Sequence, residues 1–297
     1  MTRIVVGTRN SLLAMGQAKP MVDWLKSQGH EVVWREFTTH GDRWLAGPLE
    51  KAGVTGLFTK ELEEALAARE VDLLIHSLKD VALERPEGTL RACIPLREDP
   101  FDLLILRPDA PENPTLGTSA VRRERMLRQL LPQARFTWIR GNVPTRLQRV
   151  RDGVLREEPL HGTLLAAAGL KRLGLDLAGL EVRALTPEEL LPAPGQGALL
   201  AETRTDRPDI VEALAPLHHS ATALCVDLER RVLAGLGGGC QQPLGALAED
   251  LGDGRVRLRA AFAQEHGIVR AQAEGDPEAA LAQVLSLFRA QGLVWAQ

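Results

Sequence analysis

Cys240 lies at the centre of a glycine-rich stretch, Gly235-Leu-Gly-Gly-Gly-Cys-Gln-Gln-Pro-Leu-Gly245. Glycine allows positive φ angles and close backbone approach, so we expect a loop here. Structural free cysteines are usually buried and inert, and a thiol in such a loop is oddly placed for packing. It could carry a group covalently, act as a nucleophile or be incidental, and the loop alone leaves all three open.

Basic and hydroxyl side chains follow the strands expected along the chain. In open parallel sheets ligands bind beyond the carboxyl ends of the strands, where helix starts also favour anions. Any one arginine there could simply pair with a surface carboxylate. Repeated at the strand ends of two domains, the set predicts a polyanionic ligand with carboxylates or phosphates. Its members are Thr8, Arg9, Ser11, Ser77, Lys79, Asp80, Thr118, Ser119, Arg122, Arg123, Arg140, Arg146, Lys171 and Arg172.

Asp80 is an acidic residue among these basic neighbours. One interpretation is a plain ion pair with Lys79 or with an arginine. The other is an acceptor-only carboxylate in a cationic cleft, which would hold N–H groups of a ligand and stabilise developing positive charge. The sequence leaves both open.

Composition argues against several classes of function. The net charge of −3 disfavours a nucleic-acid surface. The excess of thirty arginines over six lysines is open to two interpretations: genome composition or thermal adaptation, or planar recognition of carboxylates or phosphates. Three widely spaced cysteines and the absence of HExxH spacing indicate neither a disulfide framework nor a metal site. Gly237-Gly-Gly239 lacks the Lys-Ser/Thr of a phosphate-binding loop. With no apolar run of membrane-spanning length and a strand-like start, we expect a cytoplasmic protein without a membrane partner.

Alternating strand and helix patterns place these residues. Strands are expected at 3–6, 31–37, 71–76 and 90–95, then at 102–106, 135–139 and 162–166. Helices are expected at 12–28, 57–69, 120–131 and 167–173. Another helix is expected to follow the loop at 140–146 and to end at residue 152. Such alternation predicts βαβ units around mostly parallel sheets.

The last section differs in kind. A helix at 221–234 precedes the cysteine loop, two alternating segments flank the hairpin signal Gly252-Asp-Gly254, and a helix at 277–290 closes the chain. This predicts a small α+β module. Proline-rich connections at 95–100 and 185–196 are the expected crossings, which gives three α/β domains in all.

A set of motifs runs along nearly the whole chain and resembles the porphobilinogen deaminase (hydroxymethylbilane synthase) family. Each motif is moderately specific, but their order and spacing together are very specific. They are Gly7-Thr-Arg-Asn-Ser-Leu-Leu-Ala14, Gly56-Leu-Phe-Thr-Lys-Glu-Leu-Glu63, His76-Ser-Leu-Lys-Asp-Val81, Gly117-Thr-Ser-Ala-Val-Arg-Arg123, Arg140-Gly-Asn-Val-Pro-Thr-Arg-Leu147, Ala168-Gly-Leu-Lys-Arg-Leu-Gly174, Pro194-Gly-Gln-Gly197 and Gly237-Gly-Gly-Cys-Gln-Gln-Pro-Leu-Gly245.

The resemblance implies two lobes similar to those of periplasmic binding proteins, plus a small C-terminal α+β domain that carries the cofactor cysteine. The implied boundaries are 1–94 with 192–213 for domain 1, 98–188 for domain 2 and 217–297 for domain 3. The proline-rich crossings could act as hinges. We expect a monomer.

The resemblance also implies a dipyrromethane cofactor, held by a thioether to Cys240. The family is a transferase of tetrapyrrole and heme biosynthesis, which joins four porphobilinogens head to tail with loss of ammonia and then releases hydroxymethylbilane. Asp80 would be the catalytic carboxylate. By match, cofactor side chains would be held by Ser77, Lys79, Thr118, Ser119, Arg122, Arg123, Arg140, Arg146 and Gln196. Substrate would be held by Arg9, Ser11, Gln17, Arg140, Arg146 and Arg172.

Two positions depart from the family pattern. Thr55 stands where a basic residue is frequent, and Ala120 replaces a serine, so grip on carboxylates could differ. The sequence supports two other functions less well. A two-lobed binding protein for a small polycarboxylate would not need the third domain, and a cysteine-nucleophile acyl transferase lacks an obvious His-Asp set.

Overall fold

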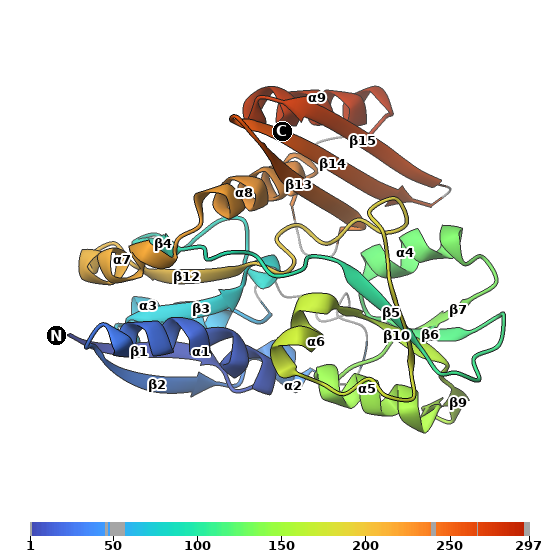
Figure 1. Ribbon diagram of the computed structural model, residues 1–297, viewed down its shortest axis with the longest axis horizontal. Coiled ribbons are helices and arrows are strands. Elements are labelled where there is room, and N and C mark those ends of the chain that lie inside the picture. Colours follow the sequence, from blue (N-terminus) through green and yellow to red (C-terminus); the bar gives the residue numbers. More distant parts are fainter. Residues whose placement is uncertain (1, 45–46, 48–56, 239–241, 266, 294–297) are drawn as a thin grey trace.

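The computed structural model describes residues 2–44, 47, 57–238, 242–265 and 267–293. Cys240 and Thr55 lie outside the described residues. Two lobes, each built on a β-sheet, lie side by side, and a smaller C-terminal domain lies across one end of both (Figure 1). This is the expected α/β class. The exact domain boundaries given above stay a prediction.

The first lobe has a five-stranded sheet in the order β2-β1-β3-β12-β4. The strands are β1 (Arg3–Arg9), β2 (Glu31–Phe37), β3 (Leu73–Ser77), β4 (Thr89–Cys93) and β12 (Leu199–Arg204). β1 runs parallel to β2 and β3, whereas β12 is antiparallel to β3 and β4. Four of the five strands therefore run in the same direction, as expected of a mostly parallel sheet, and β12 runs against them. β12 arrives from the second lobe beside Ser77, the last residue of β3, and so must run back along it.

Helices cover the faces of this sheet. They are α1 (Leu12–Ser27), α2 (His40–Arg43), α3 (Lys60–Ala67), the 3₁₀ turn η2 (Leu78–Asp80), α7 (Pro208–Leu214) and the 3₁₀ turn η3 (Ala215–Leu217). The Ser11 hydroxyl accepts a hydrogen bond from the Ala14 N–H and so caps α1. Apolar α1 residues such as Met21 and Leu25 pack on the β1 residues Ile4 and Val6 in one buried cluster.

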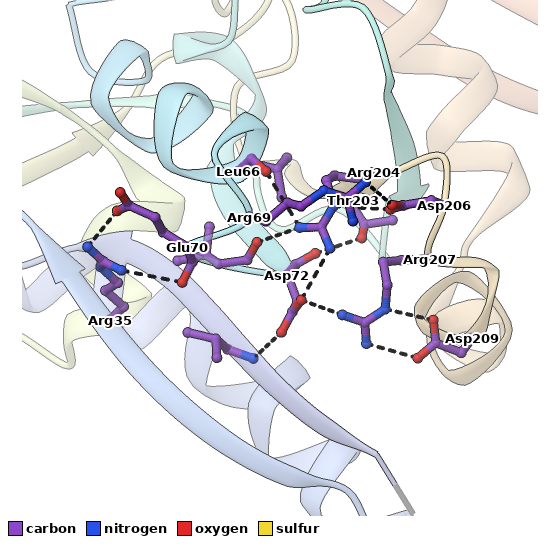
Figure 2. Close-up of polar contacts among 12 residues, drawn as sticks. Arg35, Leu66, Arg69, Glu70, Asp72, Thr203, Arg204, Asp206, Arg207 and Asp209 are labelled. Carbon is purple, nitrogen blue, oxygen red and sulfur yellow. Dashed lines mark hydrogen bonds and ion pairs between the residues drawn. The ribbon is translucent and has the colours of Figure 1, made fainter.

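Asp72 holds together the edge of this sheet that lies opposite the loops after β1 and β3 (Figure 2). Its carboxylate accepts a hydrogen bond from the Val5 N–H at 2.9 Å and pairs with Arg204 and Arg207. These arginines end β12 and precede α7, so the returning segment is fastened to β1 and β3 by charge as well as by strand pairing.

The second lobe has a sheet in the order β11-β5-β10-β6-β7. Its strands are β5 (Asp102–Leu106), β6 (Thr115–Gly117), β7 (Arg135–Thr137), β10 (Gly162–Ala166) and β11 (Glu181–Ala184). Its helices are α4 (Val121–Leu130), α5 (Val143–Asp152) and α6 (Ala167–Leu173), and a small hairpin joins β8 (Val154–Leu155) to β9 (Glu158–Pro159). β10 is parallel to β6 but antiparallel to β5, so this sheet is mixed as well.

The C-terminal domain packs two helices on an antiparallel sheet. Its elements are α8 (Ser220–Gly235), β13 (Leu244–Gly252), β14 (Arg255–Gln264), β15 (Gly267–Gly275) and α9 (Pro277–Ala290). The hairpin predicted around Gly252-Asp-Gly254 is confirmed between β13 and β14. The third strand, β15, was not expected. One sheet face packs on α8 and α9, while Ala261 and Ala263 share a buried cluster with Met126 and Leu127 of the second lobe.

No helix within the described ranges has both the length and the apolar character needed to cross a membrane. Likewise, the described side chains contain no group of three or more His, Cys, Asp and Glu residues placed to hold a metal ion.

Candidate active site

The carboxyl ends of β1 and β3 form a small pocket in the first lobe. It encloses about 20 Å³, room for roughly one water molecule, and its walls include Arg9, Gln17, Phe58, Ser77 and Asp80. The Ser77 hydroxyl donates a hydrogen bond to the Gln17 side-chain oxygen at 3.0 Å. The structure thus brings together four of the residues chosen from the sequence.

Asp80 ends the short turn η2, directly after β3. Its half-buried carboxylate makes no hydrogen bond or ion pair with any residue that the structure describes, so its oxygens remain available as acceptors. The turn itself is firmly held, because the Arg230 guanidinium on α8 donates to the carbonyls of Leu78, Val81 and Ala82 at 3.2, 3.0 and 2.7 Å. The C-terminal domain therefore positions this carboxylate.

Arg9 is held by a carboxylate that the sequence analysis did not single out. Its guanidinium pairs with Asp42 and stacks over the Phe58 ring at 4.4 Å. Burial raises the pKa of Asp42, but the hydrogen bonds and charge of Arg9, with hydrogen bonds from Thr39, outweigh this and hold it below its usual value. A substrate carboxylate at Arg9 would have to share the guanidinium with Asp42.

Lys79 is a half-buried cation directly before Asp80 in the chain. Its ammonium group donates to the Gln196 side-chain oxygen at 3.3 Å. Burial lowers the pKa of Lys79 to about 8, helped by the positive charges of Arg122 and Arg123, although Asp80 and Asp102 act in the opposite sense. Lys79 therefore loses its proton at a pH slightly above neutral.

Asp102, at the start of β5, is a fully buried carboxylate that the sequence analysis missed. It accepts hydrogen bonds from Arg122 at 2.6 Å, from Arg123 at 2.7 Å and from Gln196 at 3.0 Å. Burial raises its pKa, but the two guanidinium charges outweigh burial and hold the pKa well below its usual range. Gln196 thus links Lys79 of the first lobe to Asp102 of the second.

Arg122 and Arg123 are consequently occupied by protein groups. Besides Asp102, Arg122 donates to the Leu191 carbonyl at 2.6 Å, and Arg123 donates to the Leu164 carbonyl at 2.9 Å. Two cations share one anion, which leaves a net positive charge beside Lys79. Asp102 could have been suspected from the sequence as a carboxylate opening an apolar strand, but its partners are about twenty residues or more away.

Thr118 and Ser119 shape the turn into α4. The Thr118 hydroxyl accepts from the Ala120 N–H at 3.2 Å, and the Ser119 hydroxyl donates to the Ile139 carbonyl at 2.6 Å. Ala120 is the N-cap residue directly before α4 and offers no side-chain cap. The first N–H groups of the helix therefore lack the hydroxyl acceptor that a serine would supply.

Arg140, Arg146 and Arg172 are hydrogen-bonded to backbone carbonyls. Arg140 reaches from the second lobe to the Gly41 and Trp44 carbonyls of the first lobe at 3.0 and 2.9 Å. Arg146 donates to the Gly141 carbonyl at 2.8 Å; burial lowers its pKa to about 10, as do Arg123, Arg140 and Arg149. Arg172 donates to the Gly197 carbonyl at 2.8 Å. No ion pair joins these three to a carboxylate in the described part of the chain.

The end of the cysteine loop that the structure describes lies beside the Asp80 turn. A side chain added at Gly238 would come within 3.1 Å of the Leu83 side chain. Gly238 precedes Cys240 by two residues, and Leu83 follows Asp80 by three. Gly237 and Gly238 both have positive φ, 83° and 69°, which few other residues adopt.

Two family models match the chain. Residues 4–212 match "Porphobilinogen deaminase, dipyromethane cofactor binding domain", and residues 223–287 match "Porphobilinogen deaminase, C-terminal domain". Together they cover the two lobes and most of the third domain.

Curated relatives carry the same name. The porphobilinogen deaminase of Albidiferax ferrireducens is 44% identical, covering 84% of this chain and 78% of that protein. The porphobilinogen deaminase of Nitratidesulfovibrio vulgaris strain Miyazaki F is 41% identical, over 99% and 94% of the two chains. A solved structure, the periplasmic aliphatic sulphonate binding protein SsuA of Escherichia coli, is 10% identical with a TM-score of 0.41, over 98% and 88% of the two chains. That score is too low to carry an argument, but the family models and the curated relatives suffice, and the chain belongs to the porphobilinogen deaminase family.

Proposed function

We propose that this chain is a transferase that condenses four porphobilinogen units head to tail onto a dipyrromethane held by Cys240. Hydrolysis then releases the product, hydroxymethylbilane. The observation that carries the proposal is the Asp80 carboxylate. It lies at a strand end among cations, next to the loop that bears Cys240, with its acceptor oxygens unused by the described residues.

The residues present fit a dipyrromethane. Its pyrrole N–H groups need an acceptor such as Asp80, and its acetate and propionate groups need cations. Arg140 and Arg146 supply guanidinium groups whose described partners are backbone carbonyls. Charge-assisted hydrogen bonds to such groups contribute roughly 1.5–3 kcal/mol each. The cofactor roles of Ser77, Thr118, Ser119, Arg122 and Arg123 stay predictions.

When bound, the dipyrromethane supplies a free pyrrole α-carbon as the nucleophile. The group would be held at its carboxylates by Arg140 and Arg146, and its α-carbon would bond to the aminomethyl carbon of porphobilinogen as ammonia leaves that carbon and a proton leaves the α-carbon. Positive charge develops on the substrate ring as ammonia departs. The Asp80 carboxylate stabilises that charge and accepts hydrogen bonds from pyrrole N–H groups.

Other residues of the chain bind and orient. Lys79, charged below pH 8, attracts a carboxylate, and Gln196 fixes the Lys79 ammonium group. Arg9, Ser11, Gln17 and Arg172 are proposed to hold the incoming porphobilinogen. We also propose that the protein is a cytoplasmic monomer, on composition and on the family resemblance, which cell fractionation and gel filtration would check.

The test compares Asp80→Asn with Asp253→Asn, which changes an exposed carboxylate in the β13–β14 turn. The intact mass of both proteins should exceed the sequence mass by one dipyrromethane. Porphobilinogen consumption should fall by about 10²–10³-fold in Asp80→Asn, the size of effect seen when one stabilising group is removed. The Asp253→Asn control should keep the full rate.

Two results would contradict the proposal. Near-normal turnover by Asp80→Asn would remove the role of the carboxylate. A wild-type chain that binds porphobilinogen without releasing ammonia, and whose mass stays bare after incubation with it, would point to a binding protein instead.

A further inference from the structure

The β8–β9 hairpin carries an arginine that the proposed reaction has not used. Arg156 and Glu157 form its two-residue turn, with positive φ angles of 51° and 68° as a tight hairpin requires. The turn folds Arg156 back over the end of β7. Its guanidinium lies 3.6 Å from the centre of the Trp138 ring and donates to the Thr137 hydroxyl at 2.7 Å and to the Trp138 carbonyl at 3.0 Å. An exposed side chain is thus held in one place.

Arg149 links Arg156 to the inner cations. It lies on α5, half-buried, and donates to the Arg140 carbonyl at 3.0 Å. Its charge acts on both sides: after burial, the positive charge of Arg149 lowers the pKa of Arg156, and it is among the charges that lower the pKa of Arg146. Arg149 and Arg156 also donate to the carbonyls of Arg140 and Trp138, which lie two positions apart in the segment after β7, so both guanidinium groups lie along one stretch of backbone. Arg140, Arg146, Arg149 and Arg156 together are called the cationic row.

None of the four arginines of this row forms an ion pair with a carboxylate among the described residues. Arg149 and Arg156 hydrogen-bond to neutral oxygens, and Arg156 makes no ion pair with Glu157 or Glu158 beside it in the hairpin. Like charges held close together raise the free energy of the folded chain. An anion that pairs with them recovers this cost and binds more strongly as a result.

We propose that Arg149 and Arg156 form an outer carboxylate site, which takes acetate and propionate groups of pyrrole units added after the first condensation. The inference rests on the proposed function, in which each added unit brings two further carboxylates. In this proposal Arg140 and Arg146 bind the carboxylates of the dipyrromethane, which are present at the start. Arg149 and Arg156 bind the carboxylates of the units that are added later.

The experiment counts added units by intact mass. Full-length Arg149→Ala, Arg156→Ala and a matched control, Arg151→Ala, receive one to four equivalents of porphobilinogen and are quenched. Arg151 is on the same helix but donates to the Asp176 carbonyl, away from the row. We expect the species with one added unit at its wild-type level, and those with three or four added units to be reduced about tenfold in the first two variants, as for one lost charge-assisted bond.

A second measurement does not depend on catalysis. Mellitate, a benzene ring with six carboxylates, serves as the probe in calorimetric titrations of the same proteins. Its dissociation constant should rise about tenfold in Arg149→Ala and Arg156→Ala and should stay unchanged in Arg151→Ala.

The outcomes separate the two proposals. Unchanged unit distributions in both variants overturn the outer site, and if Arg156→Ala then only melts at lower temperature, its stacking on Trp138 is structural. Weaker mellitate binding with an unchanged distribution overturns the assignment to later units. If wild-type protein gains no mass at all, the proposed function fails, while the mellitate titration still decides whether the pair binds carboxylates.

Discussion

The charge of Lys79 changes with pH just above neutrality. Its burial and the guanidinium groups of Arg122 and Arg123 disfavour the ammonium form, so its pKa falls to about 8 from 10.5. Below pH 8 the group is charged and attracts a carboxylate. Above pH 8 the neutral amine loses that attraction, although a bound carboxylate would itself raise the pKa.

We therefore expect kcat/KM for porphobilinogen to fall as pH rises through about 8. The measurement is a pH–rate profile between pH 6 and roughly 10. The amine of the substrate also titrates in this region, so the Lys79→Arg variant is the control, because guanidinium keeps its charge. A Lys79→Arg profile with the same alkaline limb as the wild type would assign that limb to the substrate.

Strand-end reasoning identified several site residues because they follow apolar strands directly. Ser77 and Asp80 indeed line one pocket with Arg9 and Gln17. The same reasoning did not identify Asp42 or Asp102. Both act through partners that are distant in sequence, and nothing in the local pattern shows that a carboxylate is fully buried between two guanidinium groups.

At the scale of elements, Glu229 fastens α8 to both crossings between the lobes. The fully buried carboxylate pairs with Arg97 at 2.6 Å and accepts from the Gly195 and Ala248 N–H groups at 2.7 and 3.0 Å. One side chain thus joins the two connecting segments to the C-terminal domain. Its hydrogen bonds satisfy a charge that would otherwise be costly to bury.

We predict that Glu229→Gln lowers the free energy of unfolding by about 3–5 kcal/mol, since it leaves Arg97 buried without its counter-charge. The matched control is Glu278→Gln on α9, which breaks the exposed ion pair with Arg231, a residue of α8 like Glu229. This change should lower the free energy of unfolding by roughly 0–1 kcal/mol. Urea unfolding of both variants measures the difference. Equal losses would mean that burial adds nothing to the Glu229 pair.

The sequence predicted most helices and the buried strands, because their periodicities are strong. The helix expected at 277–290 is α9 to the residue, and the strand at 102–106 is β5. Strand direction and the late strands were harder. β12 begins apolar but ends Glu-Thr-Arg, and its antiparallel course follows from where the second lobe ends, which no local pattern encodes.

For the whole molecule, the attached dipyrromethane should be a structural component. Without it, the arginines around Arg140 and Arg146 repel one another with no described carboxylate paired to them. We predict that Cys240→Ser, which cannot form the thioether, unfolds roughly 5 °C below the wild type. Adding salt to about 1 M should narrow the gap, because screening acts most on uncompensated charge.

Differential scanning calorimetry of both proteins at low and high salt tests this. The mass of each protein must first show that the wild type carries the group and that Cys240→Ser does not. A gap that salt leaves unchanged would mean that the cofactor stabilises by packing rather than by neutralising the arginines.

The place of β12 in the first sheet also fixes the order in which a growing chain can be completed on the ribosome. β12 lies between β3 and β4, and β4 pairs with no other strand of the sheet. β12 leaves the ribosome roughly a hundred residues after β4, which takes about 5–20 seconds at ordinary rates of translation. By the end of that interval every described strand of the second lobe has been made. Of the two lobes, the one that starts first is therefore finished last, and the free edge of β3 must stay unpaired until β12 arrives.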